Sequence, residues 1–189
     1  MNATEELSFS HRRFTADELD RMVAAGVVGE DEPLELLNGE LVAVRPQGPN
    51  HIRPLSRLVG RLARAYGAAY EVQPQGPIDC GADSRPEPDV AVAAPDPGRP
   101  GDRLVRGDEL VLAIEVAHTS QALDHAKAAI YARAGVPEYW ILDIAARRLE
   151  VQRQPTAGGI YEVVTILAET QSITAPSLDT PWLISDLLP

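Results

Sequence analysis

The sequence has little of what several classes of protein require. Cys80 is the only cysteine in 189 residues, so no disulfide can form within the chain and a reducing compartment is expected. No apolar run approaches the roughly 18 residues of a membrane-spanning helix. Residues 1–6 include two glutamates and no apolar core, unlike a secretory signal. We therefore expect a cytoplasmic protein that does not bind membranes.

Basic residues are scarce as well. The chain has 17 lysines and arginines against 28 aspartates and glutamates, a net charge of −11. Nonspecific coating of nucleic acid depends on many cations that neutralise phosphates, so this composition excludes it. A DNA partner would need a local basic patch. Residues 54–66, with Arg53 directly before them, supply one if they form a helix, because a turn of about 100° per residue places four arginines opposite the apolar face: Arg53, Arg57, Arg61 and Arg64. An ordinary solvated face is the alternative interpretation.

The length and the order of the predicted elements indicate one domain over residues 1–189. A capping box at Thr15 and Glu18 begins a helix that ends near Gly26, and Asn38-Gly39 predicts a hairpin. After the arginine-bearing helix, we expect strands near 71–73, 89–94 and 110–117, a helix over 122–134, and strands over 138–143, 149–154 and 161–167, the last two forming a second hairpin. This order predicts an α/β fold with a central mixed sheet flanked by helices.

Two carboxylates stand at apolar strands. Glu115 interrupts the run 110–117, and Asp89 directly precedes the run 90–94. A buried carboxylate is costly unless a cation or donors meet it, so the two acids suggest a metal site. We expect Mg²⁺, or Mn²⁺ as a substitute, held by Asp89, Glu115 and the backbone carbonyl of Val116. Such an ion promotes hydrolysis of a phosphodiester, and Lys127 would orient the attacking water or stabilise the charge on the phosphate.

Pro88-Asp89 followed by Glu115-Val116-Ala117 resembles the skeleton of the restriction-endonuclease-like, PD-(D/E)xK nucleases. Ala117 stands where that superfamily has its lysine. In one branch, the Uma-two family, the lysine lies on the next helix, and the chain resembles this family in several segments: Glu35-Leu36-Leu37-Asn38-Gly39-Glu40, Pro88 to Val92, Ile114-Glu115-Val116, Lys127, Tyr131, Gly135 to Trp140 and Asp143. The loop His118-Thr119-Ser120 differs from the family's Ser-Pro-Ser/Thr.

The resemblance implies a restriction-endonuclease-like fold and a metal-dependent DNA endonuclease that works as a homodimer. It assigns the core of the site to Asp89, Glu115 and Lys127, with Glu35 as an added acid near the metal. The two carboxylates should then lie within reach of one ion, with Lys127 converging on them. For a dimer contact, the apolar residues of the C-terminal segment are a candidate, although they could instead close the core: Trp182-Leu183-Ile184 and Leu187-Leu188.

Each candidate residue also has a structural interpretation. Glu115 could pair with a buried arginine, and Asp89 could open a turn. Lys127 could form a surface ion pair with Asp124, and Glu35 could be a solvated cross-strand partner. Two other functions remain open: a catalytically silent nuclease fold that binds nucleic acid or protein, and a component of a defence or mobile-element system that acts only within a complex.

Overall fold

The computed structural model of the protein describes residues 11–29, 31–44, 48–117 and 121–189. The loop His118-Thr119-Ser120, where the sequence departs from the family pattern, lies outside the described residues. Within the described ranges, no helix has both the length and the apolar character needed to cross a membrane.

The N-terminal part contains one short helix and one hairpin, as predicted. Helix α1 (Ala16–Ala24) begins with the expected capping box, in which Thr15 and Glu18 exchange side-chain and backbone hydrogen bonds. Strands β1 (Leu34–Leu37) and β2 (Glu40–Ala43) pair in antiparallel fashion. Asn38 and Gly39 both have positive φ, 50° and 80°, which is what a tight two-residue hairpin turn requires.

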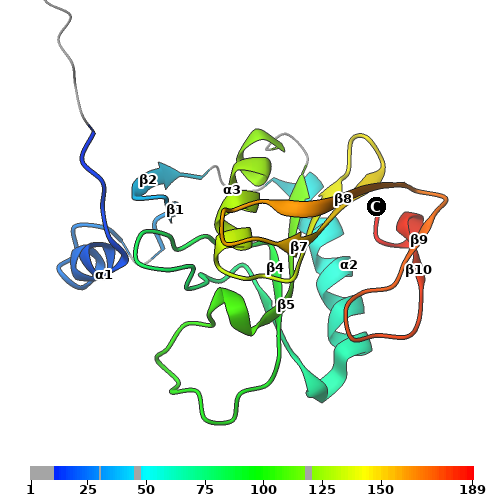
Figure 1. The fold of residues 1–189 in the computed structure, drawn as a ribbon, viewed down its shortest axis with the longest axis horizontal. Coiled ribbons are helices and arrows are strands. Elements are labelled where there is room, and N and C mark those ends of the chain that lie inside the picture. Colours follow the sequence, from blue (N-terminus) through cyan, green and yellow to red (C-terminus); the bar gives the residue numbers. More distant parts are fainter. Residues whose placement is uncertain (1–10, 30, 45–47, 118–120) are drawn as a thin grey trace, which may run out of the picture.

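A six-stranded mixed sheet forms the centre of the molecule (Figure 1). Its order is β3-β4-β5-β6-β7-β8, and only the β5–β6 pair is parallel. The strands are β3 (Glu71–Pro74), β4 (Val90–Ala93), β5 (Leu110–Ala117), β6 (Glu138–Asp143), β7 (Arg148–Pro155) and β8 (Tyr161–Ala168). The predicted hairpin of the last two strands is confirmed, and every residue of β4 and β6 is buried.

Two long helices cover opposite faces of this sheet (Figure 1). Helix α3 (Gln121–Arg133) agrees with its prediction, and Gly135 follows it with a φ of 80°. Helix α2 spans Pro49–Tyr66, so the prediction that it begins at Pro54 was wrong. Pro49 takes the first turn instead, and Pro54 lies inside the helix at the cost of one backbone hydrogen bond. Short 3-10 helices occupy Gly67–Ala69, Gly107–Glu109 and Ile184–Asp186.

The C-terminal segment closes the core beneath α2. Strands β9 (Ser172–Ile173) and β10 (Trp182–Leu183) form a small separate sheet. Trp182, Ile184 and Leu187 are buried in the same apolar cluster as the inner face of α2. Trp182, Ile184, Leu187 and Leu188 therefore close the core, whereas Leu183 is 46% exposed and remains available for a contact.

Candidate metal centre

Asp89 and Glu115 lie side by side on adjacent strands. Val90 pairs with Ile114 in the antiparallel β4–β5 ladder, so the next pair outward is Asp89 with Glu115. The Asp89 carboxylate is fixed there because its Oδ2 accepts a hydrogen bond of 2.7 Å from the backbone N–H of Val116. Both acids are buried, with exposed fractions of 5% and 4%.

The two carboxylates also share one face of the sheet. Side chains alternate between faces along a strand, and Ala91 and Ala113, two residues from the two acids, pack in the cluster that contains Tyr131 of α3. Asp89 and Glu115 therefore point towards α3. The two acids thus face the same side of the sheet, as expected. The interpretation of Asp89 as a simple turn residue does not explain its buried position opposite Glu115.

Lys127 extends from α3 into this acidic cluster. Its Nζ donates to the carboxylate of Glu35 at 2.9 Å, to Oε1 of Glu115 at 3.0 Å and to the carbonyl of Glu87 at 3.2 Å. These three bonds use all the donors of an ammonium group. The surface ion-pair interpretation is wrong, because only 3% of Lys127 is exposed.

Lys127 is also the only lysine of the chain, since the other 16 basic residues are arginines. A compact ammonium can place three donors around one point, whereas a guanidinium is planar and larger. This single lysine among 17 basic residues is a signal in the composition that the motifs alone do not contain. Burial disfavours the charge of Lys127, but the carboxylates of Glu115 and Glu35 outweigh that effect and raise its pKa.

The electrostatics of Glu115 indicate a site with excess negative charge. Burial raises the pKa of the Glu115 carboxyl to about 8, against the opposing effect of the Lys127 charge. Three neighbouring acids raise this pKa further: Asp89, Asp124 and Glu35. The partner of Glu115 is thus a lysine, and not the arginine of the structural interpretation. The single positive charge of this lysine does not offset the negative charge of the neighbouring acids.

Glu35 is buried in β1 rather than solvated, so its interpretation as an exposed cross-strand partner is wrong. One of its oxygens accepts from Lys127, and Oε2 accepts from the backbone N–H of Glu87 at 3.2 Å. Glu87 therefore bonds to both members of the Glu35–Lys127 pair through its backbone. Sequence reasoning missed Glu87, although it stands between Pro86 and Pro88, immediately before the Asp89 strand.

Tyr131 is a second contact to which the sequence motifs assign no role. Its hydroxyl donates to Oε1 of Glu115 at 3.1 Å, and its side chain is fully buried. Oε1 of Glu115 therefore receives two donors, one from Lys127 and one from Tyr131. Within the described residues, neither of these bonds involves Oε2.

The donors present here fit a hard divalent cation. The carboxylates of Asp89 and Glu115 and the backbone carbonyl of Val116 are oxygen ligands, which Mg²⁺ and Mn²⁺ prefer. Across the described ranges, no three His, Cys, Asp or Glu side chains are gathered as metal ligands. A site here would therefore have two carboxylates, with water or phosphate oxygens completing the coordination, as is common for Mg²⁺.

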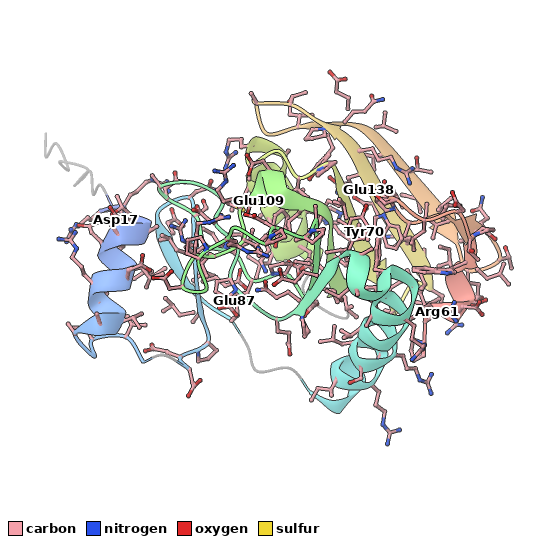
Figure 2. The ribbon with its side chains drawn as sticks, turned by 90° about the horizontal axis from the view of Figure 1, so that it is seen from below. Asp17, Arg61, Tyr70, Glu87, Glu109 and Glu138 are labelled. Carbon is pink, nitrogen blue, oxygen red and sulfur yellow. The ribbon has the colours of Figure 1, made fainter. Side chains whose placement is uncertain are left out.

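The four arginines are not brought to this cluster, because α2 covers the opposite face of the sheet. Arg53, Arg57 and Arg64 are exposed on its outer side. Arg61 is partly covered, with its guanidinium 3.5 Å from Asp186 and 5.8 Å from the ring centre of Trp182. Figure 2 shows Arg61 well separated from Glu87, which borders the acidic cluster.

Helix α2 begins at the end of the sheet where β5 ends (Figure 1). The same end carries the acidic cluster, because Asp89 precedes β4 and Glu115 stands near the end of β5. Arg53 and Arg57, in the first half of α2, are therefore nearer to the cluster along the sheet than Arg64, which is in the last turn.

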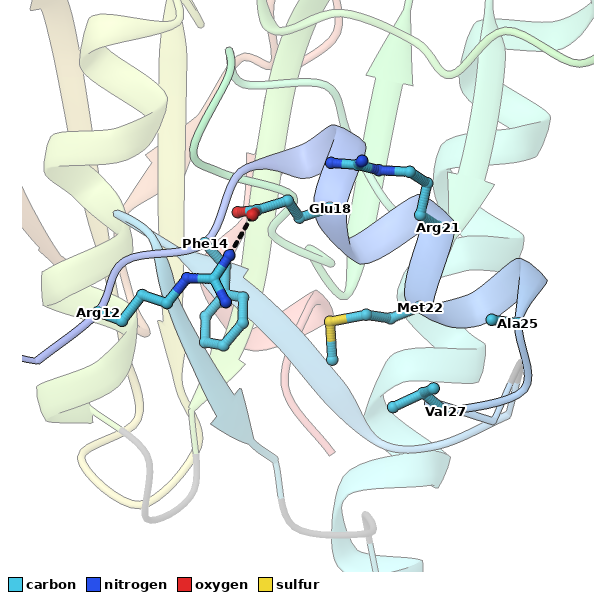
Figure 3. Close-up of a pocket in the computed structure, with 7 residues that line it drawn as sticks. All are labelled: Arg12, Phe14, Glu18, Arg21, Met22, Ala25 and Val27. Atoms are coloured by element: carbon cyan, nitrogen blue, oxygen red, sulfur yellow. Dashed lines mark hydrogen bonds and ion pairs between the residues drawn. The ribbon is translucent and has the colours of Figure 1, made fainter.

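Two hollows lie near the N-terminal helix. The smaller, about 280 Å³, is formed by α1 and the segments before and after it, and includes Phe14, Met22 and Val27 (Figure 3). The larger, about 480 Å³, is lined by Leu19 of α1, by Leu104 and by Glu87. Burial raises the pKa of the Glu87 carboxyl, Glu35 raises it further, and Lys127 lowers it. Glu87 thus connects the larger hollow to the acidic cluster.

Comparison with known proteins agrees with this architecture. The model of the Uma2 family, described as "Putative restriction endonuclease", matches residues 16–184. A crystal structure from Anabaena variabilis, described as "a putative nuclease belonging to DUF820", superimposes with a TM-score of 0.74 at 18% sequence identity. The match covers 92% of this chain and 97% of the other, and it confirms the predicted nuclease fold. No curated protein matches the sequence significantly.

Proposed function

The chain belongs to the Uma2 family, and we propose that it is a metal-dependent DNA endonuclease that hydrolyses phosphodiester bonds. The observation that carries the proposal is the buried convergence of Asp89, Glu115 and Lys127 from two adjacent strands and a facing helix. Restriction-endonuclease-like proteins generally use divalent metal ions. We propose Mg²⁺ as the ion, with Mn²⁺ as a substitute.

Asp89 and Glu115 would hold the ion through carboxylate oxygens, together with the backbone carbonyl of Val116. The bound ion would supply Lewis acidity at the scissile phosphate and at the attacking water. Asp89 is prepared for this role because the Val116 N–H fixes one of its oxygens. Glu115 is prepared because Lys127 and Tyr131 both bond to Oε1.

Lys127 would stabilise charge on the phosphate or orient the attacking water. Its pKa is raised, so it stays cationic at neutral pH. All three of its donors are used within the protein, so one bond must be exchanged for a substrate oxygen. The bond to the Glu87 carbonyl is the longest at 3.2 Å, and the carbonyl carries no full charge. We propose that this bond is the one exchanged, while Glu35 keeps Lys127 in place.

For DNA, we propose that Arg53 and Arg57 contact phosphates, with Arg64 further along the helix. Arg61 would contribute less, because its charge already faces Asp186. For these contacts, a duplex would have to pass the end of the sheet at which both the start of α2 and the cluster lie. We further propose that the protein acts in the cytoplasm as one domain per chain, and as a homodimer in which each subunit addresses one strand.

A catalytically silent binding protein is the second candidate. The fully bonded Lys127 and the net charge of −11 favour it. An enzyme that acts only with a partner that supplies DNA affinity would show weak DNA binding alone at physiological salt.

Plasmid cleavage combined with calorimetric metal titration tests the proposal. The wild type should bind Mn²⁺ and nick or linearise plasmid, and Asp89→Asn should lose both properties. The exposed Asp179→Asn is the matched control and should retain both. Metal binding without cleavage at any salt concentration would favour the silent candidate, and absence of metal binding would refute the proposed site.

A further inference from the structure

We propose that Tyr131 is a positioning residue that restricts Glu115 to a single oxygen for metal binding and thereby favours Mg²⁺ over Ca²⁺. This inference rests on the proposed function of the site. Its basis is that Tyr131 and Lys127 donate to the same oxygen, Oε1 of Glu115, at 3.1 and 3.0 Å.

Two donors on one carboxylate oxygen occupy both of its lone pairs. A metal ion can then bind that carboxylate only through the other oxygen, Oε2. Mg²⁺ requires a compact octahedral shell of single oxygen contacts, whereas Ca²⁺ takes six to eight ligands and commonly binds both oxygens of a carboxylate. A Glu115 limited to Oε2 therefore suits the smaller ion and denies Ca²⁺ one of its preferred contacts.

The position of Tyr131 makes this restriction rigid. Its side chain is fully buried and packs against Tyr139, with ring centres 4.9 Å apart. Tyr131 and Lys127 stand four residues apart on α3, so both donors project from the same face of one helix. Because the side chain is fully buried, the Tyr131 hydroxyl has no contact with solvent that could replace its bond to Glu115 when an ion enters.

The chain offers a matched control in Tyr139. This tyrosine is equally buried in the same cluster, but its hydroxyl donates to the backbone carbonyl of Asp124 at 2.8 Å and not to Glu115. Tyr131→Phe and Tyr139→Phe each remove one buried hydroxyl and its hydrogen bond. A general loss of stability should affect both variants, and a change in metal preference should affect only Tyr131→Phe.

The test is calorimetric titration of the DNA-free protein with Mg²⁺ and with Ca²⁺, after chelator treatment and dialysis. The ratio of the Ca²⁺ Kd to the Mg²⁺ Kd should fall by about three- to tenfold in Tyr131→Phe, the range expected for one hydrogen bond. Tyr139→Phe should keep the wild-type ratio. An unchanged ratio in Tyr131→Phe overturns the inference but leaves the metal site intact. If the wild type binds neither ion, the proposed function itself fails.

Infrared spectroscopy tests the same idea without a change at Tyr131, which matters if Tyr131→Phe does not fold. The Mg²⁺-minus-chelator difference spectrum of the wild type, recorded with and without ¹³C at the side-chain carboxyls of glutamate, separates the bands of Glu115 from those of Asp89. A band separation typical of single-oxygen coordination supports the inference. A separation typical of coordination through both oxygens overturns it.

Discussion

The ammonium group of Lys127 lies 2.9 Å from the carboxylate of Glu35, a residue 92 positions earlier in the chain, and both side chains are buried. This pair joins the N-terminal hairpin to α3 at the point where α3 faces the sheet. The backbone of Glu87 bonds to both partners and so fixes the loop that leads into Asp89. The N-terminal hairpin is therefore part of the candidate centre.

Replacing Lys127 tests the role of its charge. Lys127→Met leaves the buried carboxylates of Glu35 and Glu115 without their shared cation, and should cost ~3–5 kcal/mol of unfolding free energy. Denaturant unfolding in EDTA measures this loss. Adding Glu35→Gln should restore part of it, because one uncompensated charge is removed. A double variant as unstable as Lys127→Met would contradict the pairing.

Lys127→Arg keeps the positive charge but changes the geometry of the donors, so it tests these two properties separately. A planar guanidinium cannot direct three donors from one atom to Glu35, Glu115 and the Glu87 carbonyl. We expect this variant to retain Mn²⁺ binding and lose plasmid cleavage.

Because Lys127 is the only lysine, wild-type protein that contains lysine labelled with ¹⁵N at Nζ should give one side-chain resonance, and that resonance should shift on metal addition.

Glu115→Gln should make the stability of the metal-free protein less sensitive to rising pH. In the wild type, burial raises the pKa of Glu115 from 4.5 to about 8. The unfolded chain then releases this proton near pH 4.5 and the folded protein holds it to about 8, so stability falls as pH rises across that window. Glu115→Gln removes this fall. In EDTA, the free energy of unfolding of the variant should exceed that of the wild type by an amount that grows between pH 5 and pH 8.

Thermal or urea unfolding at several pH values measures this difference. The same variant should lose plasmid cleavage, because the amide carries no charge to hold the ion. A glutamine variant that is clearly less stable than the wild type at pH 8, yet still cleaves plasmid, would instead identify Glu115 as a structural partner of Lys127.

Arg57→Ala and Arg61→Ala should have different effects, although the two residues stand four apart on α2. Arg57 is exposed, and its loss should weaken DNA binding and lower the slope of log K against log salt by about 1. Arg61 faces Asp186 and Trp182, and its loss should reduce stability slightly, by ~0.5 kcal/mol, with a smaller effect on the slope. Fluorescence anisotropy over a salt series distinguishes them. Equal slopes for wild type and Arg57→Ala would contradict the proposal that α2 binds DNA.

Besides Leu183 of the C-terminal segment, the edge strand β8 is a candidate surface for the proposed homodimer. Every second residue of an edge strand directs its backbone N–H and C=O away from the sheet. Val164 and Ile166 of β8 are each 55% exposed. We expect two copies to pair through this edge. Sedimentation velocity at micromolar concentration should show a dimer for the wild type and a monomer for Val164→Lys/Ile166→Lys.

Val27→Lys is the control, because Val27 is 69% exposed on the turn after α1, away from β8. It should remain dimeric. A monomeric wild type would refute the homodimer. A double variant that remains dimeric would show that the dimer contact lies on a surface other than β8.

Local patterns in the sequence were enough to predict most elements. The capping box at Thr15, the Asn38-Gly39 turn and Gly135 after α3 each use chemistry that acts over a few residues, so their outcome does not depend on the rest of the fold. Apolar runs predicted the buried strands for the same reason. The start of α2 was misjudged because two prolines compete for its first turn, and Pro49 takes it.

The acids at Asp89 and Glu115 were also evident from the sequence, since a carboxylate beside or within an apolar run is costly unless it has a partner. The family resemblance grouped Lys127 and Glu35 with these acids, but the individual hydrogen bonds among them were decided only by tertiary structure. Glu35, Tyr131 and Lys127 reach Glu115 or one another from elements up to 92 positions apart, and no local pattern encodes such distances.

The tertiary structure likewise decided the surroundings of the centre. An amphipathic helix shows which side chains face inward, but it does not show which face of the sheet it covers, so the arginines of α2 could not be placed relative to the acids. Trp182 and Leu187 are apolar whether they close a core or bind a partner, and burial within one chain decided the matter. The sequence by itself determined the elements and the buried acids, because these follow from short-range geometry and desolvation. Packing between distant segments determined how those acids are neutralised and which surfaces remain open.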